Sequence, residues 1–261
     1  MKPSILLTVS VLGSSLVGAN ASTTFSFITD TWTNGANTQA GYLDGANSGT
    51  LSKDGVTLSF VSTFAGSGIA ATRNLTLDDG NPTGFVFGTN TDPNDLGGSL
   101  VNYQRWDFSF SQPIIINSLI LDDIDSDRTD PLATDGFRDA IAAEGFSTFA
   151  PGAIGSGVDV SFNSGSGLIA GVIAAGSGQS LNYVIAAPAN NPNNDPIHRA
   201  ELGFGSTPVS SFSIYSFSDR SQSHRVSLFQ GKVEVTVVPE PSVTLLGLAA
   251  LPLLARRRRL A

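Results

Sequence analysis

The chain of 261 residues contains no cysteine, only two histidines and few charged residues, which make up 14% of it. Without cysteine there is no disulfide, no thiolate metal site and no cysteine nucleophile. His198 and His224 each lie beside an arginine in a polar stretch, which is typical of exposed loops, and they lack the i, i+4 spacing of a zinc site. No G-x-S-x-G elbow occurs, which argues against a serine hydrolase.

Long helical patterns are also missing from the body of the chain. Apolar and polar residues instead alternate with period two in several short runs, for example at Trp106, Phe108 and Phe110, and turn residues such as Asp54-Gly55 separate the runs. Further strand candidates are residues 84–87, 114–121, 158–162, 168–173, 181–185, 209–217 and 226–238. The best helical candidate, 137–144, could equally be a strand. This pattern predicts one all-β domain, an antiparallel β-sandwich of jelly-roll-like type.

The N-terminus has the composition of a secretory signal peptide. Lys2 precedes an apolar-rich run at residues 5–17, and Ala19-Asn20-Ala21 provides the small residues of a cleavage site. We therefore expect residues 1–21 to be removed and residues 22–237 to form a single β-sandwich ectodomain.

The last 24 residues, 238–261, consist of three parts. Pro239, Glu240 and Pro241 end a strand-like run, because proline lacks the N–H group that a β-ladder needs. Residues 243–255 are uncharged and almost wholly apolar, and they are followed at once by four arginines: Arg256, Arg257, Arg258 and Arg259. This order would keep the arginines on the cytoplasmic side of a membrane. The apolar segment covers only about 20 Å of a hydrocarbon core of about 30 Å, which favours transient over durable attachment.

This arrangement closely resembles the PEP-CTERM sorting signal of bacteria, which is also known as the ice-binding protein C-terminal domain. The resemblance covers residues 238–261 alone. It implies that the protein uses the secretion translocon, is held transiently in the inner membrane by a C-terminal helix, and is processed near Pro239-Glu240-Pro241 by an exosortase. It also implies a link to exopolysaccharide and biofilm. Ice binding itself has little support, because regular threonine arrays are missing.

The body between these two segments is distinctly acidic. The chain has 14 basic and 22 acidic residues. Outside the body lie Lys2, the four terminal arginines and Glu240, so residues 22–238 keep nine basic and 21 acidic residues, a net charge of about −12. Such a charge argues against nucleic acid as a partner, since phosphate binding needs clustered lysine and arginine.

A run of aspartates follows an apolar strand within residues 112–144. Carboxylates this close repel one another unless they are hydrated, paired or bound to a cation, and Ca²⁺ prefers oxygen ligands. The candidate calcium ligands are Asp122, Asp123, Asp125, Asp127 and Asp130. An EF-hand is excluded, because Arg128 stands where the loop requires glycine. The alternative is a solvated acidic loop with surface ion pairs.

The sequence contains no recognisable catalytic constellation, and we predict that the protein is not an enzyme. We expect a cell-surface or extracellular structural or binding module, with polysaccharide as the candidate ligand. The alternative is a secreted polysaccharide hydrolase, for which Glu144 and Glu201 are the two carboxylates to test. Of the aromatic residues that could stack on sugars, Trp106 belongs on a buried strand face, and Trp32, near Asn34-Gly35, is the better candidate for exposure.

Overall fold

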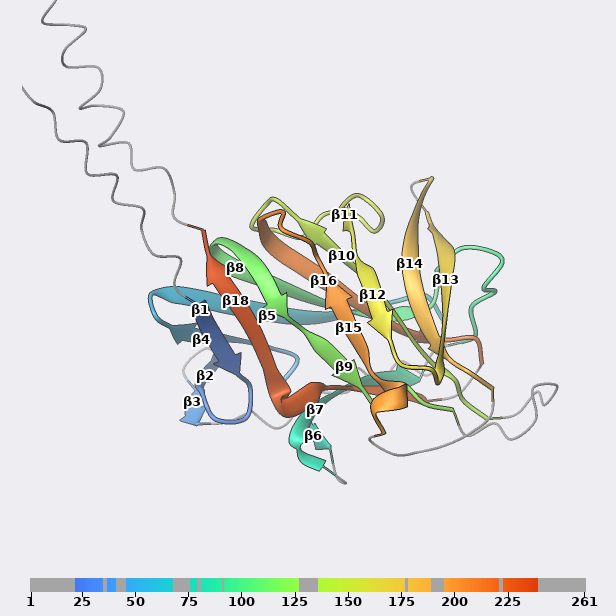
Figure 1. Ribbon diagram of the computed structural model, residues 1–261, viewed down its shortest axis with the longest axis horizontal. Coiled ribbons are helices and arrows are strands. Elements are labelled where there is room, and N and C mark those ends of the chain that lie inside the picture. The colour runs from blue at the N-terminus through green and yellow to red at the C-terminus, as the bar shows by residue number, and fades with distance from the viewer. Residues whose placement is uncertain are drawn as a thin grey trace, which may run out of the picture.

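The described part of the chain is an antiparallel β-sandwich, as predicted (Figure 1). The computed structural model describes residues 22–34, 37–40, 46–67, 76–78, 81–90, 92–126, 136–176, 178–188, 195–220 and 223–238. The expected signal peptide and C-terminal apolar helix lie outside these residues. In the described part, no helix has the length and apolarity that crossing a membrane requires.

Within the part of the chain that is described, the larger sheet has twelve strands. Its main path runs in the order β13 (Leu168–Ala175), β14 (Gln179–Ala186), β10 (Asp139–Phe146), β16 (Val209–Ser218), β8 (Tyr103–Ser118), β5 (Val56–Ala65), β4 (Ser48–Lys53), β2 (Thr31–Asn34) and β3 (Asn37–Ala40). In addition, β18 (Lys232–Val237) pairs with β8 and with β1 (Ser22–Ser26), and β11 (Val158–Asp159) pairs with β10.

The smaller sheet has six strands in the described residues, and its core-facing side chains pack against those of the larger sheet. Its order is β12 (Ser161–Ser164), β15 (Ala200–Gly203), β9 (Ile120–Asp122), β17 (Ser223–Leu228), β7 (Asn81–Asn90) and β6 (Thr76–Asp78). The described helices are two 3₁₀ turns, η1 (Pro196–His198) and η2 (Phe229–Gly231). Successive strands β7 to β10 alternate between the two sheets, which is the jelly-roll-like winding that the sequence predicts.

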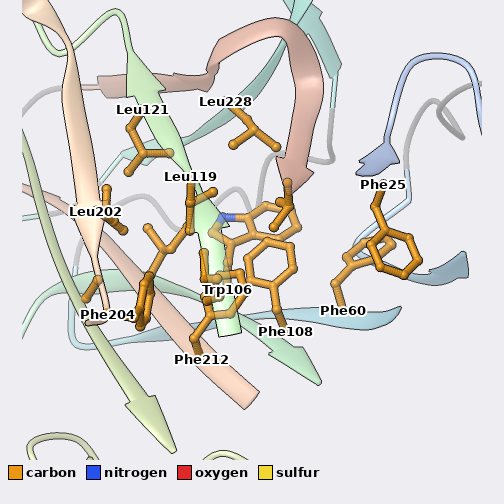
Figure 2. Close-up of a cluster of buried hydrophobic side chains, with 14 of the residues drawn as sticks. Phe25, Phe60, Trp106, Phe108, Leu119, Leu121, Leu202, Phe204, Phe212 and Leu228 are labelled. Atoms are coloured by element: carbon orange, nitrogen blue, oxygen red, sulfur yellow. The ribbon is translucent and has the colours of Figure 1, made fainter. Parts of the chain in front are cut away.

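The main core lies between the sheets and follows the predicted period-two pattern. In β8, Trp106, Phe108 and Phe110 point inward and are buried, while the residues between them face the other side. Phe108 stacks on Phe212 of β16 with ring centroids 4.7 Å apart. Figure 2 shows Trp106, Phe108 and Phe212 together with leucines of the smaller sheet, including Leu121. Burial of such large side chains is the main driving force for closing the sandwich.

A second apolar cluster covers part of the outer face of the larger sheet. It contains Tyr215 and Phe217 from β16 and Leu181 and Tyr183 from β14, and the segment 92–102 packs over it through Leu100 and other residues. Both faces of β10 and β16 are consequently buried. The predicted helical candidate 137–144 is mostly β10, a central strand, because its residues are buried on both sides.

The first and last strands of the described body are neighbours in the larger sheet. β1 pairs with β18 in antiparallel register, with Ser22 opposite Thr236 and Phe25 opposite Val233. Phe25 and Val233 are both buried in the main core. The first and last strands therefore hold each other, and the described body begins and ends at neighbouring strand ends.

Candidate functional site

The aspartate at the end of β9 is paired with an arginine. Asp122 is 1% exposed, and its Oδ2 accepts a hydrogen bond of 2.9 Å from Nε of Arg199. Its Oδ1 accepts the backbone N–H of Asp123 at 2.9 Å. The Arg199 guanidinium also lies 4.1 Å from the ring centre of Phe229. Arg199 thus supplies the positive charge that a buried carboxylate needs.

The other predicted calcium ligands do not gather around Asp122 within the described residues. Asp125 is buried and joins β10, because its carbonyl accepts the N–H of Asp139 at 2.9 Å. Asp127 and Asp130 lie outside the described residues. Among the residues that are described, no group of three or more histidines, cysteines, aspartates or glutamates could hold a metal ion. The calcium site stays a prediction.

Glu144 lies on the outer face of the larger sheet, beneath the segment 147–157. Its carboxylate is 1% exposed and accepts hydrogen bonds from the backbone N–H groups of Gly155 at 3.0 Å and Gly157 at 2.8 Å. It also accepts a hydrogen bond from the Tyr215 hydroxyl. Burial, followed by this hydrogen bond to Glu144, raises the pKa of the Tyr215 phenol well above its usual value. A carboxylate enclosed in this way holds a loop in place and has no access to a substrate.

An arginine next to Glu144 ties the same segment to the sheet. Arg105 donates from Nε to Asp107 at 2.6 Å and from Nη2 to the carbonyl of Gly152 at 2.7 Å. Burial alone would lower the pKa of Arg105, but its interactions with Tyr215 and Asp107 outweigh this effect and raise the pKa. We call Arg105, Asp107, Glu144, Ser213 and Tyr215 the buried polar network. Its hydrogen bonds pair charges that would otherwise be costly to bury.

Glu201 belongs to a different surface. It lies on the outer face of the smaller sheet, because its neighbours Ala200 and Leu202 point into the main core. The sandwich core therefore separates Glu201 from Glu144, and these two glutamates cannot act on one bond as a glycosidase pair. The hydrolase alternative stays a prediction, with Glu201 as its accessible carboxylate.

Around Glu201 the outer face is hollowed. β12 and β15 pair with Ser161 opposite Gly203 and Asn163 opposite Glu201, so these four residues form one patch. Asn163 Nδ2 lies 3.5 Å from Glu201 Oε2. The patch opens into a hollow of about 250 Å³ whose lining also includes Asn117. The Ser161 side chain covers Gly203: its hydroxyl donates to the Gly203 carbonyl at 3.2 Å, and a Cβ at Gly203 would come within 2.5 Å of Ser161 Oγ.

A second hollow, of about 380 Å³, lies on the other side of β12, where the two sheets meet at their edges. It is lined by Ser161, Phe162, Ala170, Gly171, Val172, Asn182 and Tyr183. Figure 1 shows β12 between β15 and the β13–β14 pair, and the carbonyl of Val160, just before β12, accepts a hydrogen bond from Asn182 of β14 at 3.1 Å. We call these two hollows, joined at Ser161, the β12 furrow.

Two expectations about exposure were wrong. Trp32 is fully buried, and its indole N–H donates to the carbonyl of Phe27 at 3.0 Å, because the turn after β1 folds this ring into the core. His198 is 4% exposed, because η1 turns its side chain inward although its neighbours are polar. The side chain of His224 lies outside the described part.

The sequence analysis did not find the β12 furrow. The only available signal was the alternation Ser161-x-Asn163 and Glu201-x-Gly203, in which small and polar residues mark one strand face. The predicted sorting motif, Pro239 to Pro241, and the arginines at 256–259 lie beyond the last described residue, Val238.

Fold and surface together define a β-sandwich with a closed network on one outer face and an open furrow at one edge. Comparison of the chain with protein-family models, with curated proteins and with solved structures gave no match.

Proposed function

We propose that this chain is an exported protein whose sandwich works at the cell surface or in the extracellular matrix as a structural or binding module. Residues 238–261 act as its sorting signal and are removed by an exosortase. The protein engages the secretion translocon first and the inner membrane only transiently.

The pairing of β1 with β18 supports this proposal. With Ser22 opposite Thr236, the segments on both sides of the body join it at adjacent strand ends. Cleavage after Ala21 and near Pro239 would leave the core residues of both strands in place, including Phe25 and Val235. Cleavage at these two positions therefore keeps the core side chains of β1 and β18 in the body.

The acidic charge of the body, about −12, supports a location in solution outside the cell. A net negative charge disfavours contact of the body with the anionic face of a membrane. Attachment through the tail alone fits this distribution of charge.

The test follows both ends of the chain in a host with or without an exosortase gene. One epitope tag is placed between residues 22 and 23 and a second after Ala261, and cell and medium fractions are blotted for each. We expect the first tag outside the inner membrane without the second, and only when the exosortase is present. Glu240→Ala should stop processing, whereas Glu234→Ala, a matched change on β18, should not.

Two results would contradict the proposal. One is a body that leaves the cell with the second tag still attached. The other is processing that proceeds equally in the host without exosortase.

A further inference from the structure

β13 is the last strand at one end of the larger sheet (Figure 1). It pairs with β14 without a register shift, from Leu168 opposite Ala186 to Ala175 opposite Gln179. In the described part of the chain, no second strand pairs with its other side. A strand edge of this kind can accept another extended strand, because its backbone N–H and C=O groups have no partner strand.

The segment 92–102 closes one end of this edge. The N–H of Ala174 donates to the carbonyl of Gly98 at 3.3 Å, and the carbonyl of Ala174 accepts the N–H of Leu100 at 2.9 Å. These two hydrogen bonds show which side of β13 faces away from β14: it is the side to which Ala174 directs its N–H and C=O.

The open part of the edge covers residues 168–172. Alternate residues of a strand direct their N–H and C=O groups to the same side, so Ala170 and Val172 share the orientation of Ala174. The N–H of Leu168 already donates to the carbonyl of Gly165 at 3.1 Å, which leaves the carbonyl of Leu168 for a partner. The open groups are therefore centred on Ala170.

The side chains of β13 do not protect this edge. The strand, LIAGVIAA, contains no charged residue and no proline, the two residue types that commonly block pairing at an edge. Ile169 is 46% exposed and Val172 is 59% exposed. The residues that line the hollow beside β13 are uncharged as well. The chemistry of the edge thus suits a strand that is itself uncharged and apolar.

From these observations we infer that β13 pairs with β13 of a second copy of this chain, antiparallel and across a twofold axis at Ala170. The N–H and C=O of Ala170 in each copy then bond to those of the other. The N–H of Val172 in each copy meets the carbonyl of Leu168 in the other. The contact is closed, because the same five residues are used on both sides.

The side chains fit the same register. Ile169 of one copy lies opposite Gly171 of the other, where the Tyr183 ring covers the glycine so closely that a Cβ would come within 2.4 Å of it. On the other strand face, Val172 lies opposite Leu168. Both exposed side chains of β13 thereby gain an apolar neighbour and lose contact with water.

Size and charge make this dimer weak. A contact through residues 168–172 is much smaller than a standard interface of about 20–30 residues a side, and interfaces of small area are weak and transient. Each body also carries about −12, so two copies repel each other over a distance that shortens as salt is added. The dimer should therefore become tighter at higher ionic strength.

The experiment exploits the absence of cysteine from the chain. Ala170→Cys places two thiols at the twofold axis, on residues whose Cα atoms would be about 5.5 Å apart, within the range of a disulfide. Ala174→Cys is the matched control, an exposed alanine on the same strand face, and its two copies would lie about 27 Å apart. The full chain is purified in a mild detergent, and disulfide dimers are followed by gel electrophoresis with oxidised glutathione as the oxidant.

We expect Ala170→Cys to cross-link at least about tenfold faster than Ala174→Cys, and faster still when salt is added. Association through the C-terminal segment would affect both cysteine variants alike, so their ratio reports on β13. Adding Val172→Lys to Ala170→Cys should slow cross-linking about tenfold, because a charge at the edge opposes pairing. Val61→Lys is the matched control for that charge, since Val61 is 42% exposed on β5, a strand with partners on both sides.

Three results would overturn the inference: no disulfide dimer of Ala170→Cys, equal rates for the two cysteine variants, or a rate for Ala170→Cys that Val172→Lys leaves unchanged. All four substituted positions are exposed, so thermal unfolding should stay close to that of the parent and verifies the fold of each variant.

Discussion

Replacing Glu144 tests whether the buried polar network is structural. The side chain accepts three hydrogen bonds, from Tyr215 and from the backbone of Gly155 and Gly157. Glutamine keeps the shape but has one acceptor oxygen. In Glu144→Gln that oxygen can still serve Tyr215 and Gly155, which share Oε1, while the new NH₂ group faces the N–H of Gly157.

The cost follows from that mismatch. A buried donor left without a partner costs about 1–3 kcal/mol, so Glu144→Gln should lower the free energy of unfolding by that amount. Glu144→Leu removes the acceptor for all three donors and should cost about 3 kcal/mol or more. For a domain with a total stability of about 5–15 kcal/mol, the second change is severe.

Urea unfolding of residues 22–238 measures both values, with fluorescence of the buried Trp32 and Trp106 as the signal. Limited proteolysis of the segment 147–157 provides a second readout, because Glu144 holds that segment to the sheet. Glu201→Gln, on the open face, is the matched control and should leave the midpoint nearly unchanged. Equal effects of the two glutamine variants would refute the structural role of Glu144, and so would a leucine variant as stable as the parent.

Two further predictions concern charge. Burial raises the pKa of Tyr103, Tyr183 and Tyr215, so the folded state keeps these phenols neutral after the unfolded chain begins to ionise. Stability should be complete below about pH 10 and should fall as the pH rises further, and Tyr215→Phe should flatten that fall in urea midpoints measured between pH 8 and 11. Arg199→Met leaves Asp122 buried without its cation and should cost about 3 kcal/mol, whereas the double variant with Asp122→Asn should recover much of the loss in the same assay.

The strands of the core could be predicted from the sequence because alternation is a local property. Alternation of Trp106, Phe108 and Phe110 with polar residues predicts which face of β8 is buried, even when its partner strands are unknown. The hairpin between β4 and β5 is equally local. Asp54 and Gly55 both have positive φ, 52° and 78°, which an Asp-Gly turn of this kind accommodates.

The sites depended on contacts between distant residues and could not be predicted. Asp122 and Arg199 are 77 positions apart and meet because β9 pairs with β15. Nothing in the polar neighbours of Trp32 reveals that the chain turns back after β1 and buries the indole ring. Asn163 shows a polar strand face, but its neighbour Glu201 is known only from the register of β12 and β15.

The two outer faces of the sandwich differ in a way that bears on function. On the outer face of the larger sheet, Arg105 and Glu144 hold the segment 147–157 by hydrogen bonds, and Asp107 pairs with Arg105. The segment 92–102 packs on the apolar cluster that contains Tyr215 and Phe217 of β16. A ligand arriving there would have to displace hydrogen bonds to charged groups, each worth about 1.5–3 kcal/mol. At the β12 edge the polar side chains face water, and the apolar Val172 is already exposed, so a ligand has little to displace.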